Sequence, residues 1–165
     1  MDFEAIVHTY QEPLYWHLRR LVVDHEDARD LLQETFLQAY RNRWQLRREE
    51  AVRAWLYKIA THAAYRHLRR HREQPLSTEE LSTLLLGRLE ASAWVDYDDA
   101  EGVRFQEALL TLSEQQRVAF TLRYYDEMSY DEIAAITGSS AGSLRVSYHQ
   151  AAKKISNYLK EHHIV

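Results

Sequence analysis

The sequence predicts an all-α protein made of two small helical domains joined by a linker, with a helix-turn-helix in the second. Only four glycines and two prolines interrupt the 165 residues, and apolar residues recur every three or four positions rather than alternating. Two neighbouring segments have opposite net charges, +8 over residues 41–72 and −7 over residues 73–107. We therefore predict domains over 1–72 and 105–165, with an acidic, partly helical linker over 73–104 between them.

The apolar periodicity and the capping residues position the individual helices. Helices are predicted over residues 2–22, 25–43, 51–71, 78–90, 103–111, 114–125, 129–137 and 140–160. In the second of these, the inward stripe consists of Ala28, Leu31, Leu32, Thr35, Phe36 and Ala39. Its opposite side carries Asp30, Gln33, Glu34 and Gln38, and such a polar row by itself predicts only a solvated face.

The helix predicted over 51–71 carries cations and aromatic rings together. Leu56, Ile59 and Ala60 suit its core-facing side. The candidate DNA-binding residues of this segment are Arg53, Trp55, Lys58, His62, Arg66, Arg69 and Arg70. Cations neutralise phosphates and flat rings stack on unpaired bases, so the combination suits DNA that is being opened. The alternative interpretation is a basic solvated face with a packing tryptophan.

Residues 129–160 are typical of two helices joined by a tight turn. Ser129 and Glu132 form a capping box, and Gly138 ends the first helix. The second helix packs inward through Leu144, Tyr148, Ala151, Ile155 and Leu159. Ser139 or Ser140 opens this helix, and its predicted outward residues are Ser143, Arg145, Ser147, His149, Gln150 and Lys153. These outward residues and Ser140 are the candidate DNA-binding residues of this segment. Small polar side chains can approach base edges in a major groove, which favours DNA binding over a plain helical hairpin in an all-α core.

In their order and spacing these segments resemble the extracytoplasmic-function (ECF) sigma factors, the two-domain specificity subunits of bacterial RNA polymerase. Residues 30–40 are similar to the family's polymerase-docking helix, and residues 55–60 to the start of the helix that meets the minus-ten promoter element. Residues 117–125 and 129–134 are similar to the second domain, whose recognition helix reads the minus-thirty-five element.

The resemblance implies a function without catalysis or cofactors. It implies that the polar face formed by Asp30, Gln33, Glu34 and Gln38 docks on core RNA polymerase. The partners it implies are core polymerase, promoter DNA and an anti-sigma factor.

The chain also departs from the family at four positions of the two DNA-binding helices. His62 and Arg66 stand where an Asn and an Asp are usual in the minus-ten helix, and Ser147 and Gln150 replace two arginines of the recognition helix.

Other function classes have less support. A stand-alone helix-turn-helix regulator would bind duplex DNA as a dimer, which leaves the basic first domain without a role. A helical metal or hydrolytic enzyme would have to use His67 with His71, or His162 with His163, without matching carboxylates. The chain has no cysteine, which excludes disulfides and thiolate metal sites. No apolar run is long enough to span a bilayer and no signal peptide precedes the first helix, so we expect a cytoplasmic protein.

Overall fold

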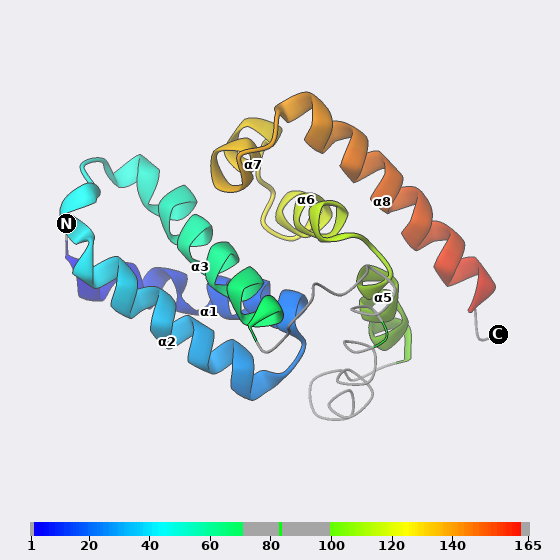
Figure 1. Ribbon diagram of the computed structural model, residues 1–165, viewed down its shortest axis with the longest axis horizontal. Helices are drawn as coiled ribbons and strands as arrows, with labels where there is room; N and C mark the ends of the chain where they lie inside the picture. Colours follow the sequence, from blue (N-terminus) through cyan, green and yellow to red (C-terminus); the bar gives the residue numbers. More distant parts are fainter. Residues whose placement is uncertain (1, 71–82, 84–99, 163–165) are drawn as a thin grey trace.

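The computed structural model describes residues 2–70, 83 and 100–162, and all regular structure in these residues is helical. The first domain contains α1 (Phe3–Val22), α2 (His25–Arg41), two short 3-10 turns η1 (Arg43–Gln45) and η2 (Glu49–Ala51), and α3 (Val52–Arg69). The second contains α5 (Ala100–Leu110), α6 (Glu114–Tyr124), α7 (Tyr130–Thr137) and α8 (Ala141–Glu161). In Figure 1 the two groups lie side by side, with the chain termini at opposite ends.

The predicted helices that fall on described residues are all present, with ends within a few positions of those expected. The helix predicted over 25–43 ends at Arg41 and is followed by η1. The helix predicted over 78–90 lies outside the described residues except for Thr83. Among the described residues, no helix is both long and apolar enough to cross a membrane.

The first domain packs α3 against α1 and α2 through small and aliphatic side chains. Ala60, Ala63 and Ala64 of α3 are at most 1% exposed, and their small size lets the helix backbones approach closely. One polar pair is buried with them, because His17 Nε2 of α1 lies 2.8 Å from Thr61 Oγ1 of α3. The pKa of His17 is lowered to about 3, mainly by burial and to a smaller extent by the nearby Arg20 charge. Its imidazole is therefore neutral near pH 7.

The second domain is built on α8, which packs along α6 and α5. The Phe120 ring stacks between Tyr124 and Tyr148, with centroid distances of 5.2 and 5.3 Å. The predicted capping box is confirmed, since Ser129 and Glu132 each bond the other's backbone N–H at the start of α7. Gly138 ends α7 with φ of +80°, a left-handed conformation that glycine adopts without the clash of a Cβ atom.

The two domains contact each other directly. Helix α7 packs against α3, and α1 touches α6. The first residue of α6, Glu114, contacts Tyr65 and Arg69 near the end of α3. The apolar core of the first domain is continuous with second-domain residues that include Val118, Leu122, Ile133 and Ile136. A separate apolar cluster, containing Leu109, Phe120 and Ile155, lies wholly within the second domain.

Candidate nucleic-acid and polymerase interfaces

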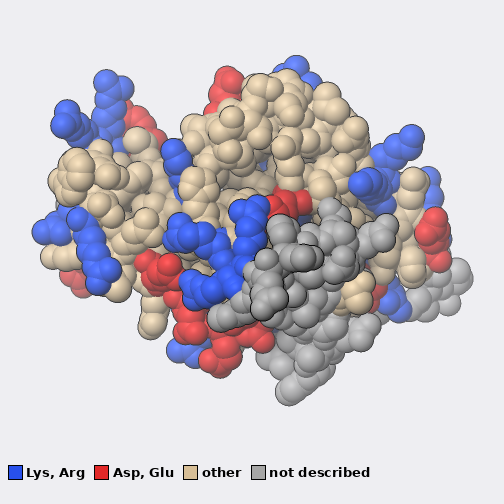
Figure 2. Space-filling view, in the orientation of Figure 1, with Lys and Arg blue, Asp and Glu red and all other residues tan. Residues whose placement is uncertain are grey.

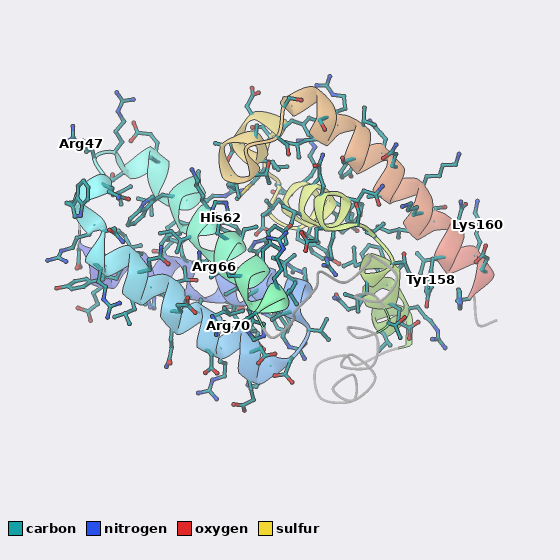
Figure 3. All side chains as sticks on the ribbon, viewed as in Figure 1. Arg47, His62, Arg66, Arg70, Tyr158 and Lys160 are labelled. Atoms are coloured by element: carbon teal, nitrogen blue, oxygen red, sulfur yellow. The ribbon has the colours of Figure 1, made fainter. Side chains whose placement is uncertain are left out.

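Helix α3 carries an exposed basic row formed by Lys58, His62, Arg66 and Arg69, followed by exposed Arg70. Figure 3 labels His62 and Arg66 along α3, with Arg70 at the end of the helix. Positions 58, 62, 66 and 69 are three or four apart and therefore share one helix face, as the sequence predicted.

Two other predicted contacts on α3 are less accessible. Arg53 is half-buried and donates a hydrogen bond to the main-chain oxygen of Asp126 in the second domain. Trp55 is half-buried and packs against the first-domain core, as in the alternative interpretation of a packing tryptophan. In this arrangement neither side chain stands out from the surface as Lys58 does.

Two side-chain contacts connect α3 to α2. Arg66 lies 3.6 Å from Glu34, and both side chains are substantially exposed. His67 Nε2 lies 3.1 Å from Asp27 Oδ2, and both groups are partly buried. The exposed Arg66 pair stabilises the fold little, because solvent screens it. It does place an acidic group of α2 beside the basic row.

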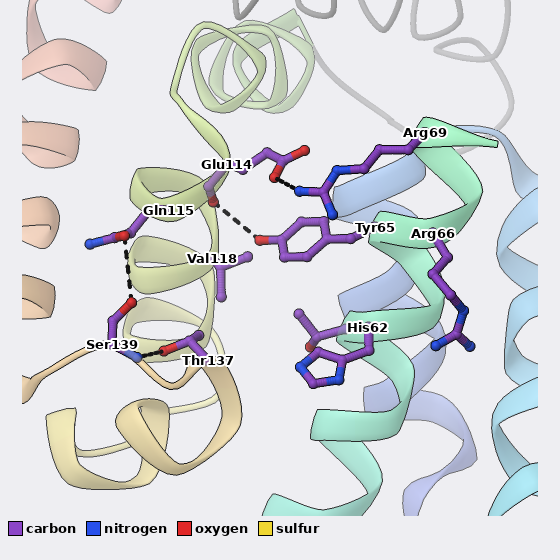
Figure 4. Close-up of a pocket in the computed structure, with 10 residues that line it drawn as sticks. His62, Tyr65, Arg66, Arg69, Glu114, Gln115, Val118, Thr137 and Ser139 are labelled. Atoms are coloured by element: carbon purple, nitrogen blue, oxygen red, sulfur yellow. Dashed lines mark hydrogen bonds and ion pairs between the residues drawn. The ribbon is translucent and has the colours of Figure 1, made fainter. Parts of the chain in front are cut away.

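Polar contacts also join α3 to the second domain. The Tyr57 hydroxyl donates to Asp126 Oδ1 at 2.6 Å, and the Tyr65 hydroxyl donates to the Glu114 main-chain oxygen at 3.3 Å. Arg69 forms an ion pair with Glu114 at 2.7 Å. Beside these contacts lies a cavity of about 450 Å³ between α3 on one side and α6 and the α7–α8 turn on the other. Figure 4 shows His62, Tyr65 and Arg69 on the α3 wall, opposite Glu114 and Gln115.

The interdomain environment changes the acidity of the groups that it buries. Burial raises the pKa of the Asp126 carboxyl, against the opposing effect of the Tyr57 hydrogen bond. Burial likewise raises the pKa of the Tyr57 hydroxyl, and the Asp126 charge adds to this effect. Burial also lowers the pKa of Arg117, which is 1% exposed. The contact between the domains therefore has a desolvation cost that offsets part of its hydrogen bonding.

The N-terminal half of α8 forms the second candidate DNA surface. Ser140 caps the helix by accepting a hydrogen bond from the Ser143 N–H at 3.1 Å. The side chains predicted to face outward are exposed at Ser143, Arg145, His149, Gln150 and Lys153. The Arg145 guanidinium lies 5.2 Å from the centre of the Tyr130 ring, which supports it from α7.

The predicted outward position of Ser147 is wrong. Ser147 is 7% exposed, and its hydroxyl accepts a hydrogen bond from Gln115 of α6 at 3.0 Å. The helix turns Val146 outward instead, with 56% of its surface exposed. Val146 was not among the predicted outward residues because a polar side chain is expected on the solvent side of a helix, and an apolar one on the inner side.

The candidate polymerase face lies on α2. Asp30 and Gln33 are exposed, whereas Glu34 and Gln38 are partly buried. Two apolar side chains that the sequence pattern did not single out are exposed on the same helix, Leu37 at 51% and Tyr40 at 47%. An acidic patch bordered by exposed apolar side chains is suited to a protein partner. The predicted inward stripe is confirmed, because every member from Ala28 to Ala39 is buried or half-buried.

No group of three or more His, Cys, Asp or Glu side chains in the described part of the chain is arranged to hold a metal ion. Of the histidines considered for a metal enzyme, His67 pairs with Asp27, and His71 and His163 fall outside the described residues.

Two family models match the chain, in separate segments. The family model described as "Sigma-70 region 2" matches residues 6–74, and "Sigma-70, region 4" matches residues 102–155. The chain is 30% identical to the RNA polymerase sigma-E factor of Streptomyces coelicolor, over 96% of this chain and 86% of the relative. It is also 30% identical to the ECF RNA polymerase sigma-E factor of Escherichia coli, over 94% and 85% of the two chains.

A solved structure supports the fold. The sigma factor RpoE of Bartonella quintana, crystallised with the anti-sigma factor NepR, superposes with a TM-score of 0.76 at 24% identity, over 96% of this chain and 97% of that one. The two matched regions and the relatives define a helical transcription initiation factor. This chain belongs to the ECF sigma factors of bacterial RNA polymerase. It therefore binds core polymerase and directs initiation at promoters, and is not an enzyme.

Proposed function

We propose that the basic row on α3 binds the minus-ten element of the promoter and holds its non-template strand as the duplex opens. The observation that carries this assignment is the alignment of Lys58, His62, Arg66 and Arg69 on one helix face. Cations in a row suit a continuous phosphate backbone. His62 supplies a flat ring on which an extruded base can stack. Arg53, Trp55 and Arg70 border this row.

The exposed half of α8 then reads the minus-thirty-five element. A helix presented by a capped turn can enter a major groove with its N-terminal residues at the base edges. Arg145 is suited to a bidentate bond with guanine, and His149 and Gln150 to further base-edge hydrogen bonds. Val146 offers an apolar surface to a thymine methyl group, a contact that its exposure supports. Ser140, Ser143 and Lys153 are suited to phosphates, and Ser147 acts by fixing α8 to Gln115.

The α2 face binds core polymerase through Asp30, Gln33, Glu34 and Gln38, extended by Leu37. Residues 1–72 form the docking and minus-ten domain, 73–104 the linker, and 105–165 the minus-thirty-five domain. An anti-sigma factor is a further expected partner, since the structurally similar sigma factor of Bartonella quintana was crystallised with one. The protein acts in the cytoplasm, where its polymerase and promoters are.

Run-off transcription with core polymerase tests this assignment. Lys58→Ala should slow promoter opening, detected by permanganate footprinting of unpaired thymines, because it removes an exposed cation from the α3 row. Lys160→Ala removes an equally exposed lysine at the far end of α8 and should leave the footprint unchanged. A normal footprint with Lys58→Ala would remove this lysine from the melting surface. Gel shift without polymerase tests the dimeric regulator, since tight specific binding by the free chain would favour it.

A further inference from the structure

The side-chain amide of Gln116 joins the first turn of α6 to α8. Gln116 is half-buried, and its Oε1 accepts a hydrogen bond from the Ser113 N–H at 3.2 Å, which closes the capping box of α6. The same oxygen accepts from Lys154 Nζ at 3.0 Å. At its other end, Gln116 Nε2 donates to Gln150 Oε1 at 3.3 Å. One side chain of α6 therefore contacts a candidate DNA-reading residue of α8.

The partners of Gln116 determine which end of its amide is the oxygen. A main-chain N–H and a lysine ammonium can only donate hydrogen bonds, so the atom that contacts Ser113 and Lys154 has to be an acceptor. The NH2 group is then the end that meets Gln150. Gln150 in turn has to present its own oxygen to accept from it. These contacts therefore set the orientation of both amides.

The neighbouring Gln115 has partners that set no such orientation. Its Nε2 donates to the hydroxyls of Ser143 and Ser147, at 3.0 Å each, and Figure 4 shows its other end directed at Ser139. A hydroxyl both donates and accepts, so these serines can bond either end of the Gln115 amide. The directional constraint on α8 comes from Gln116.

We propose that Gln116 is a positioning residue that makes Gln150 a hydrogen-bond donor toward DNA, and that it thereby selects guanine at one position of the minus-thirty-five element. This inference rests on the function proposed for α8. With its oxygen turned to α6, Gln150 offers its NH2 group to the DNA. Guanine presents two acceptors in the major groove, whereas cytosine presents a donor, adenine one of each, and thymine a single acceptor beside its methyl group.

This preference is the opposite of the usual one for glutamine. A glutamine that is free to turn pairs with adenine through both ends of its amide. At Gln150 that pairing would break the hydrogen bond from Gln116. Gln150 is exposed, and Figure 2 shows basic side chains over α8, which favour approach of the DNA backbone to this surface. The base preference of α8 therefore depends on a side chain of α6.

Gln116→Glu should invert the polarity of the contact. The α6 cap is kept, because glutamate is as suitable as glutamine at the third position after the capping serine, and the carboxylate still accepts from Lys154. A carboxylate has no hydrogen to donate to Gln150, so the Gln150 amide has to turn and donate to it. Its oxygen then faces the DNA. The preferred base should change from guanine to adenine or cytosine, which present a donor.

Gln115→Glu is the matched control. It adds the same negative charge one position away, and the hydroxyls of Ser143 and Ser147 can donate to the new carboxylate by rotating. It should therefore leave the base preference of Gln150 unchanged. Circular dichroism of each variant establishes that the helices are intact.

The measurement is the selection of bound sequences from a promoter library randomised over the minus-thirty-five element, with polymerase holoenzyme containing each variant. Gln150→Ala identifies the position that Gln150 contacts as the one where the preference is lost. Wild type should prefer guanine there by about fivefold or more. Gln116→Glu should reverse this preference, and Gln116→Glu with Gln150→Ala should abolish it. Repulsion of DNA by the added charge weakens all sequences alike and cancels in the ratio between bases.

The possible failures are distinguishable. If Gln150→Ala changes the preference at no position, the base-reading function proposed for Gln150 is contradicted. If one position depends on Gln150 but prefers another base in wild type, or still prefers guanine with Gln116→Glu, the role of Gln116 is overturned and base reading by α8 remains. A reversal with Gln115→Glu as well would attribute the change to charge and would also overturn the role of Gln116.

Discussion

The imidazole of His17 and the hydroxyl of Thr61 lie 2.8 Å apart in the interior of the first domain, where both residues are almost completely buried. They connect α1 to α3 next to Tyr57, whose ring centre is 5.1 Å from that of His17. Helix α3 is therefore joined to α1 by a neutral histidine. Protonation of this histidine would bury an unpaired charge.

Acid should destabilise the first domain through this residue. The pKa of His17 falls from 6.5 to about 3 on folding, so between these values the unfolded chain binds a proton that the folded chain does not. Stability then decreases as pH falls from about 6.5 towards 3, by on the order of 4 kcal/mol. His17→Gln keeps a hydrogen-bonding group without a titration and should flatten this part of the pH dependence, measured by urea unfolding. His8→Gln, on the exposed side of α1, should follow the wild-type curve; an identical curve for His17→Gln would contradict the assignment.

The end of α7 should tolerate only glycine well. Gly138 has a φ of +80° with no atom within 4 Å of a Cβ built on it, so strain and not space is the cost of a substitution. Gly138→Ala should lower the free energy of unfolding by about 1–2 kcal/mol. Gly142→Ala, inside α8 and also in open space, should be neutral or stabilise by up to about 1 kcal/mol. Thermal unfolding of both variants checks the contrast, and equal effects would mean that the left-handed turn is unimportant.

The α2 face can be tested by changing its charge and its apolar contact together. Asp30→Lys with Leu37→Asp should abolish association with core polymerase, because both side chains are exposed and neither supports the core. Glu12→Lys, on an exposed position of α1, is the control for charge reversal. Size-exclusion chromatography with core polymerase measures the complex. Co-elution of the double variant would exclude these two residues from the interface.

On α8, residues that read bases should be distinguishable from residues that bind phosphates by the effect of their substitution on sequence preference. Arg145→Ala should cost about 1–3 kcal/mol on the preferred promoter and relax selectivity at one position of the minus-thirty-five element. Lys153→Ala should weaken binding to all sequences alike and reduce the salt dependence. Competition gel shifts with the polymerase holoenzyme and single-base promoter variants measure both effects. Uniform losses from Arg145→Ala would assign it to a phosphate.

Val146 provides a narrower test of the same surface. Its methyl groups should favour thymine at one position, so Val146→Ser should lower the preference for thymine over uracil there, since the two bases differ only by the methyl group. Val146→Ile keeps the apolar contact and should keep the preference. Binding to promoters with a single thymine-to-uracil change measures it. A preference unaffected by Val146→Ser would mean that this side chain does not contact the base.

The local features of this protein were predictable from sequence because they depend on neighbours along the chain. The capping box at Ser129 and Glu132 and the left-handed stop at Gly138 join groups a few residues apart. The apolar stripe of α2 and the basic row of α3 follow from helical periodicity alone. The order of these elements along the chain is also enough to indicate the sigma-factor family.

Contacts between distant segments were decided only by the tertiary structure. Tyr57 and Asp126 are 69 positions apart, and no periodicity or cap relates residues at that separation. Ser147 was expected to face solvent because it is polar, but Gln115 of α6 lies over it and satisfies its hydroxyl. Helical periodicity determines which residues share a face, whereas the packing of other helices determines what covers that face. In this protein one side of α3 packs against α7 of the chain's own second domain, whereas its basic row stays exposed.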